Sequence, residues 1–146
     1  MDTRIRHRLR SNLQRDYTPA RIRRIALPEL RETADIIARI GPMTSVEAAL
    51  VHRDRLNTPL EAQIDPRVIR RIRMADTMSA VDLWELQPHR RRLIAAINDR
   101  LGDAILICPT TPSVAMPIAA LEADVEEFFH HNFRTLRNTA LGNFLD

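Results

Sequence analysis

A chain of 146 residues is the size of one folded domain, and its 45% hydrophobic and 28% charged residues are ordinary for a globular protein. All 22 basic residues are arginine and are interleaved with 19 acidic residues, so the formal net charge is +3 and the charge is not concentrated as it usually is in a nucleic-acid binder. A single cysteine excludes an internal disulfide, and no apolar run reaches the ~18 residues of a membrane span. These features favour a cytoplasmic protein.

The N-terminal part of the chain predicts a basic helix and a short strand. Residues 1–16 carry apolar side chains at four-residue spacing, which indicates a narrow apolar stripe on a helix. Residues 21–27 contain β-branched isoleucines and end at Pro28, which is typical of an edge strand. The spacing of apolar residues over 30–40 then predicts an amphipathic helix, stopped by a Gly-Pro pair.

Three further helix starts are predicted from residues whose side chains cap helix N-termini. Thr44 or Ser45 is expected to cap one helix, with Glu47 completing a capping box. Asp65 is expected to cap a second helix, because a proline follows it at the first helical position. Ser79 is expected to cap the longest one.

The segment that follows Ser79 keeps one apolar face as far as Leu101. Pro88 removes one helical hydrogen bond, so a kink or break is expected near Leu86. Trp84 is expected to anchor the core. Three consecutive arginines, residues 90–92, span about 200° of a helix, so at most one of them can point into a cleft.

Residues 104–108 form a short apolar run rich in β-branched side chains, which predicts a strand buried on both faces. Pro109 and Pro112 end it, because each lacks the N–H that a β-ladder needs. Thr110 and Thr111 lie between these prolines, at the carboxyl end of the predicted strand. In open α/β sheets this end holds the ligand sites.

The C-terminal part predicts an irregular segment over 115–121 and a last helix over about 125–141. His130 and His131 are adjacent, so they point about 100° apart and cannot both bind one metal ion from a regular helix. We therefore expect no metal site and no cofactor.

The chain resembles the C-terminal half of the amidase-signature hydrolases over roughly residues 20 to 146. The resemblance rests on the order and spacing of several motifs: residues 90–101, Asp103, residues 109–112, Arg137-Asn138-Thr139 and residues 143–146. It implies an α/β fold, helix-rich with about two short strands, in which residues 1–146 form a partial amidase domain truncated at both ends.

The resemblance also implies a small amide substrate in the complete enzyme, and one wall of its cleft is expected from this chain. One of Arg90, Arg91 and Arg92 is expected to face that cleft. The candidate substrate-lining residues are Arg91, Thr110, Thr111, Asn138 and Thr139.

Amidase-signature enzymes use a Ser–cis-Ser–Lys triad, and this chain has no lysine and four serines, none of them adjacent. Arginine stays protonated and cannot replace the lysine as a base. Three hypotheses follow. The chain is a non-catalytic portion of an amidase; or it is an interaction protein that docks on a separate N-terminal amidase half or on itself; or it is an arginine-rich nucleic-acid binder. The scattered arginines make the third the least favoured.

Overall fold

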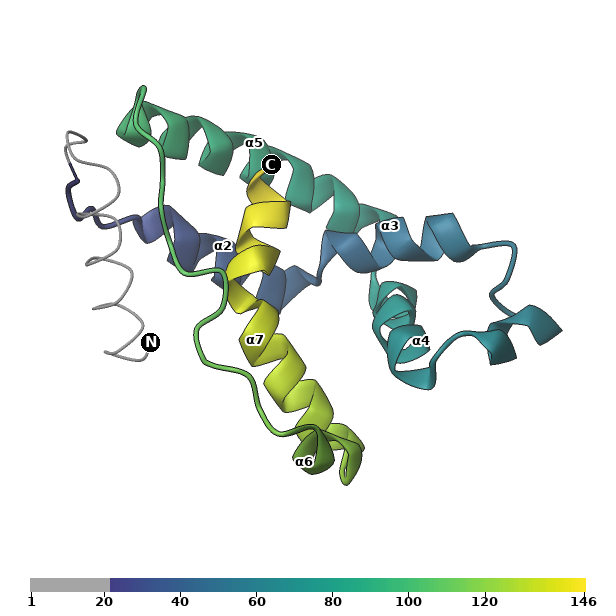
Figure 1. The fold of residues 1–146 in the computed structure, drawn as a ribbon. Coiled ribbons are helices and arrows are strands. Elements are labelled where there is room, and N and C mark those ends of the chain that lie inside the picture. The colour runs from purple at the N-terminus through teal and green to yellow at the C-terminus, as the bar shows by residue number, and fades with distance from the viewer. Residues whose placement is uncertain (1–21) are drawn as a thin grey trace. The chain divides into compact units, whose positions relative to one another are not determined.

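A computed structural model describes residues 22–146, and within them the secondary structure is entirely helical (Figure 1). The predicted helix over 1–16 lies outside the described residues. Two single-turn 3-10 helices, η1 and η2, separate some of the longer elements. The elements in chain order are α2 (Pro28–Ile40), α3 (Met43–His52), η1 (Pro59–Gln63), α4 (Pro66–Ile72), η2 (Arg73–Thr77), α5 (Ala80–Leu101), α6 (Ile118–Glu122) and α7 (Val125–Leu145).

The predicted α/β fold with two short strands is wrong, because residues 22–146 contain no strand. Residues 22–27 carry no regular structure, although a strand was expected over 21–27. Residues 104–108 are exposed instead of buried on both faces, and Ile105 is 87% accessible. A strand requires a neighbour that accepts and donates its backbone hydrogen bonds. The described residues supply no such neighbour to either segment.

The described residues divide into two compact units. Residues 28–102 and 143–146 form one, here called the core unit, and residues 22–27 and 103–142 fall in the second. The core unit is organised by the packing of α2 against α5. Its buried cluster contains Ile36, Leu86, Leu93 and Phe144, and the side chains packed around it are Ile37, Ile40, Met43, Met78 and Leu145.

Ion pairs join α2 to α5 around the apolar cluster, and one of them involves the buried Glu29. Arg39 lies 2.7 Å from Glu85, and Arg92 is paired with Glu32. At the other end of the contact, the Arg100 guanidinium donates to the Glu29 carboxylate at 2.8 Å. These pairs place opposite charges along the rim of an apolar contact and leave the cluster itself to aliphatic and aromatic side chains.

Two of the three capping predictions are confirmed. Ser79 and Asp82 form a complete capping box at the start of α5, since the Ser79 hydroxyl accepts from the Asp82 N–H at 3.1 Å and the Asp82 carboxylate accepts from the Ser79 N–H at 2.7 Å. The Asp65 carboxylate accepts from the Arg67 N–H at 2.8 Å and caps α4. The third prediction is wrong, because α3 begins at Met43 without any side-chain cap.

Helix α5 runs without a break from Ala80 to Leu101, with Pro88 inside it. A kink or break was expected near Leu86; the helix does not break there, and Leu86 is fully buried. Trp84 is 77% accessible, so the prediction that it anchors the core is wrong. The buried residues of α5 are Leu86, Leu93 and Ile97, which follow one another at spacings of seven and four positions. Trp84 does not belong to this series.

The turn between α2 and α3 depends on Gly41. Its φ of +122° lies in a region that side-chain-bearing residues rarely adopt. A Cβ added at this position would lie 2.7 Å from the Sδ atom of Met78. Backbone conformation and packing therefore both require glycine here.

In the second unit, residues 103–117 connect α5 to the short helix α6, whose presence contradicts the irregular segment expected over 115–121 (Figure 1). Asp124 caps α7 by accepting from the Glu126 N–H at 2.7 Å and the Glu127 N–H at 3.1 Å. Helix α7 was predicted to end at Leu141 and instead continues to Leu145.

Candidate functional site

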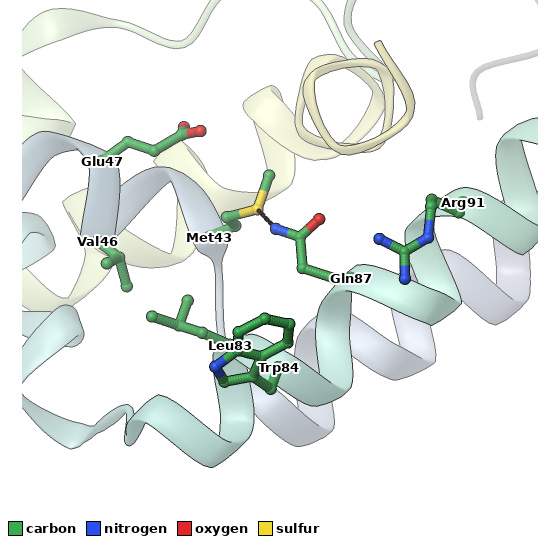
Figure 2. Close-up of a pocket in the computed structure, with 7 residues that line it drawn as sticks. All are labelled: Met43, Val46, Glu47, Leu83, Trp84, Gln87 and Arg91. Carbon is green, nitrogen blue, oxygen red and sulfur yellow. Dashed lines mark hydrogen bonds between the residues drawn. The ribbon is translucent and has the colours of Figure 1, made fainter.

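An open groove of about 540 Å³ lies on the core unit, between α3 and the first half of α5. Figure 2 shows its side chains, with Glu47 and Arg91 on opposite sides of it. Its surface is mainly apolar, and the exposed Trp84 indole is part of it. The lining residues are Met43, Val46, Glu47, Leu83, Trp84, Gln87 and Arg91.

The three consecutive arginines of α5 have different surroundings. Arg90 donates through Nε to the Phe144 carbonyl at 2.7 Å, and Arg92 is paired with Glu32. Arg91 is exposed, lines the groove and makes no hydrogen bond or ion pair with any described residue. Of the three, Arg91 is the one that lines the groove.

The groove combines an apolar wall with two charged ends and one amide. The Gln87 amide contacts the Met43 sulfur at 3.8 Å, a weak hydrogen bond that leaves its other polar atom available (Figure 2). A free guanidinium binds carboxylates through paired hydrogen bonds. The arrangement can therefore hold an elongated apolar group that ends in a carboxylate. It contains no nucleophile with an adjacent base.

The other four candidate residues lie in the second unit. The Asn138 side chain on α7 donates to the Pro109 carbonyl at 2.8 Å, so it contacts the Pro-Thr-Thr-Pro turn. The Thr111 hydroxyl donates to the Ser113 carbonyl within the turn at 2.9 Å. The Thr139 hydroxyl donates to the Leu136 carbonyl on the same helix. The side chain of Thr110 is exposed. The structure thus brings Asn138 to the turn and leaves Arg91 in a different unit.

The carboxylates with perturbed pKa values lie at helix starts and ion pairs, outside the groove. Hydrogen bonds from the Arg67 side chain and then from its backbone N–H lower the pKa of Asp65 to about 2. Hydrogen bonds from the backbone and then the hydroxyl of Ser79 lower the pKa of Asp82. The pKa of Glu29 is lowered by a backbone N–H and by Arg100. These shifts reflect stabilised ions in structural positions.

Three residues of the groove show which sequence signal was missed. Trp84, Gln87 and Arg91 follow one another at intervals of three and four, which places them on one face of α5. The buried residues of the helix, spaced at seven and four positions, lie on another face. Reading the two series separately would have assigned Trp84 to the groove.

Residues 22–146 contain no cluster of three or more histidine, cysteine or acidic side chains arranged to hold a metal ion. In the same part of the chain, no helix has both the length and the apolar character needed to cross a membrane. No family model, curated protein or solved structure matches this chain. The resemblance to amidase-signature hydrolases therefore stays a prediction from the sequence.

Proposed function

We propose that this chain is a non-catalytic interaction polypeptide that pairs with another polypeptide through residues 104–108, the apolar segment. The observation that carries the proposal is the exposure of this segment: Ile105 is 87% and Ile107 51% accessible. No hydrogen bond joins its backbone to another described residue. Exposed apolar side chains beside unpaired backbone groups are typical of an edge that another strand covers.

The amidase resemblance names one class of partner, a complementary N-terminal half that carries the Ser–cis-Ser–Lys triad, which this chain lacks. In such an assembly this chain would bind the substrate and leave the C–N bond cleavage to its partner. The guanidinium of Arg91, which has no partner among the described residues, and the adjacent groove support this role, because they fit an apolar substrate with a carboxylate. The exposed thiol of Cys108 suits a reducing compartment, so we propose a cytoplasmic location.

The test has two arms, both read by size-exclusion chromatography with light scattering. In the first, the purified chain is run alone over a wide range of concentrations. In the second, it is mixed with a polypeptide that comprises the N-terminal half of an amidase-signature hydrolase. Association in either arm, weakened by Ile105→Lys, is the expected result. A monomer in both arms would refute the proposal.

Catalysis is tested separately with simple anilide substrates. Because the chain has no lysine and no adjacent serines, we expect no hydrolysis above a buffer blank by the chain alone. Hydrolysis by the chain alone would contradict this expectation. If it persisted after each of the four serines was replaced in turn, it would contradict the amidase resemblance as well.

A further inference from the structure

The apolar segment has a sequence that is complementary to itself. Its residues are Ala104, Ile105, Leu106, Ile107 and Cys108, so the order of the central three is the same in both directions. Antiparallel pairing about a two-fold axis at Leu106 would set leucine opposite leucine and isoleucine opposite isoleucine. Such an isologous contact uses the same patch on both subunits.

One edge of this segment is blocked at Pro109, so the opposite edge is the one available for pairing with another strand. In a strand, the N–H and C=O of alternate residues point to opposite edges. Ile105, Ile107 and Pro109 would share one edge, where Pro109 has no N–H and its carbonyl accepts from Asn138 at 2.8 Å. Ala104, Leu106 and Cys108 would share the other edge, which is free of such contacts among the described residues.

Charge distinguishes the antiparallel register from a parallel one. Parallel pairing in register would place Asp103 beside Asp103 of the second copy, about 4.8 Å apart, and like charges on neighbouring strands are destabilising. Antiparallel pairing places Asp103 opposite Pro109 of the second copy instead. The side chains that the antiparallel contact brings together are all apolar, and Ile105 and Ile107 of both copies gather on one face.

We propose that two copies of this chain associate by antiparallel pairing of residues 104–108, through the edge that carries the N–H and C=O of Leu106. This inference rests on the proposed function, since it names the partner of the same segment. The pairing adds backbone hydrogen bonds to a segment that makes none with the described residues, and it brings the isoleucines of both copies together on one face. A two-stranded ribbon is marginal by itself, so the dimer is expected to depend on concentration.

Proline substitutions show which of the two edges of the segment forms the pairing. Leu106→Pro removes the N–H that pairs, whereas Ile105→Pro removes an N–H on the opposite edge and serves as the matched control. Both positions lie outside the helices, so both variants retain the core unit. We expect wild type and Ile105→Pro to dimerise with rising concentration in sedimentation experiments, and Leu106→Pro to lose the dimer.

Disulfide formation tests the register. In the proposed dimer the two Cys108 residues lie about 14 Å apart along the strands, too far for a bond, whereas residues at position 106 face each other within disulfide reach. Leu106→Cys in a Cys108→Ala background should therefore form a covalent dimer under mild oxidation, and the wild-type chain should not.

Three outcomes would overturn the inference. A dimer that persists in Leu106→Pro, or one that crosslinks through Cys108, would mean self-association by another contact and would leave the proposed function standing. A monomer at every concentration would also overturn it. In that case the proposed function depends on the arm with the N-terminal amidase half.

Discussion

Replacing Leu93 by alanine tests whether the cluster between α2 and α5 holds the core unit together. Leu93 is fully buried in that cluster. The substitution removes three carbon atoms, worth about 0.8 kcal/mol each in lost burial, and leaves a cavity that adds to the cost. We expect the free energy of unfolding to fall by about 3–4 kcal/mol. For a unit of this size that corresponds to a decrease in Tm of more than about 10 °C.

The assay is urea and thermal unfolding followed by circular dichroism at the helical band. The matched control is Val81→Ala on the same helix, because Val81 is 73% accessible. Its free energy of unfolding should stay within about 0.5 kcal/mol of the wild-type value. Equal losses in the two variants, or no loss for Leu93→Ala, would refute the assignment of Leu93 to the stabilising cluster.

Three further predictions concern helix termini and a turn. Ser79→Ala removes a cap and should lower the free energy of unfolding by about 1 kcal/mol in urea titrations; no change would contradict the capping box. Gly41→Ala forces a side chain into a positive φ and against Met78, so a loss of about 1–3 kcal/mol is expected, and a neutral variant would count against this turn geometry. The pKa of Asp65 in the folded protein lies near 2, below its usual 3.8. The ionised carboxylate therefore adds to the free energy of unfolding above pH 4, and this contribution is lost as the pH falls toward 2. Asp65→Asn should remove that pH dependence, and a carboxyl titration near pH 4 by NMR would refute it.

The features predicted correctly are those decided by residues close together in the sequence. The caps at Asp65 and Ser79 involve side chains and N–H groups two or three positions apart, so composition and spacing suffice to find them. For the arginine triplet, helix geometry alone could not choose which residue lines the groove, and the structure places Arg91 there. That choice depends on Glu32 and Phe144, which lie far away in the sequence.

The wrong predictions required knowledge of distant partners. The residue types of 104–108 favour a strand, yet a strand exists only when a second segment supplies the ladder. Trp84 was assigned to the core because large aromatic residues are commonly buried. Its helix presents Leu86 and Leu93 to α2, and the indole lies on a different face.

The exposure of Trp84 has a spectroscopic consequence. It is the chain's one tryptophan, and its indole is already largely in water in the folded state. Its fluorescence should therefore change little on unfolding, so emission spectra are a poor measure of stability for this protein. The same indole lines the groove that also contains Arg91. A blue shift on adding an apolar carboxylate would report binding there with no label attached.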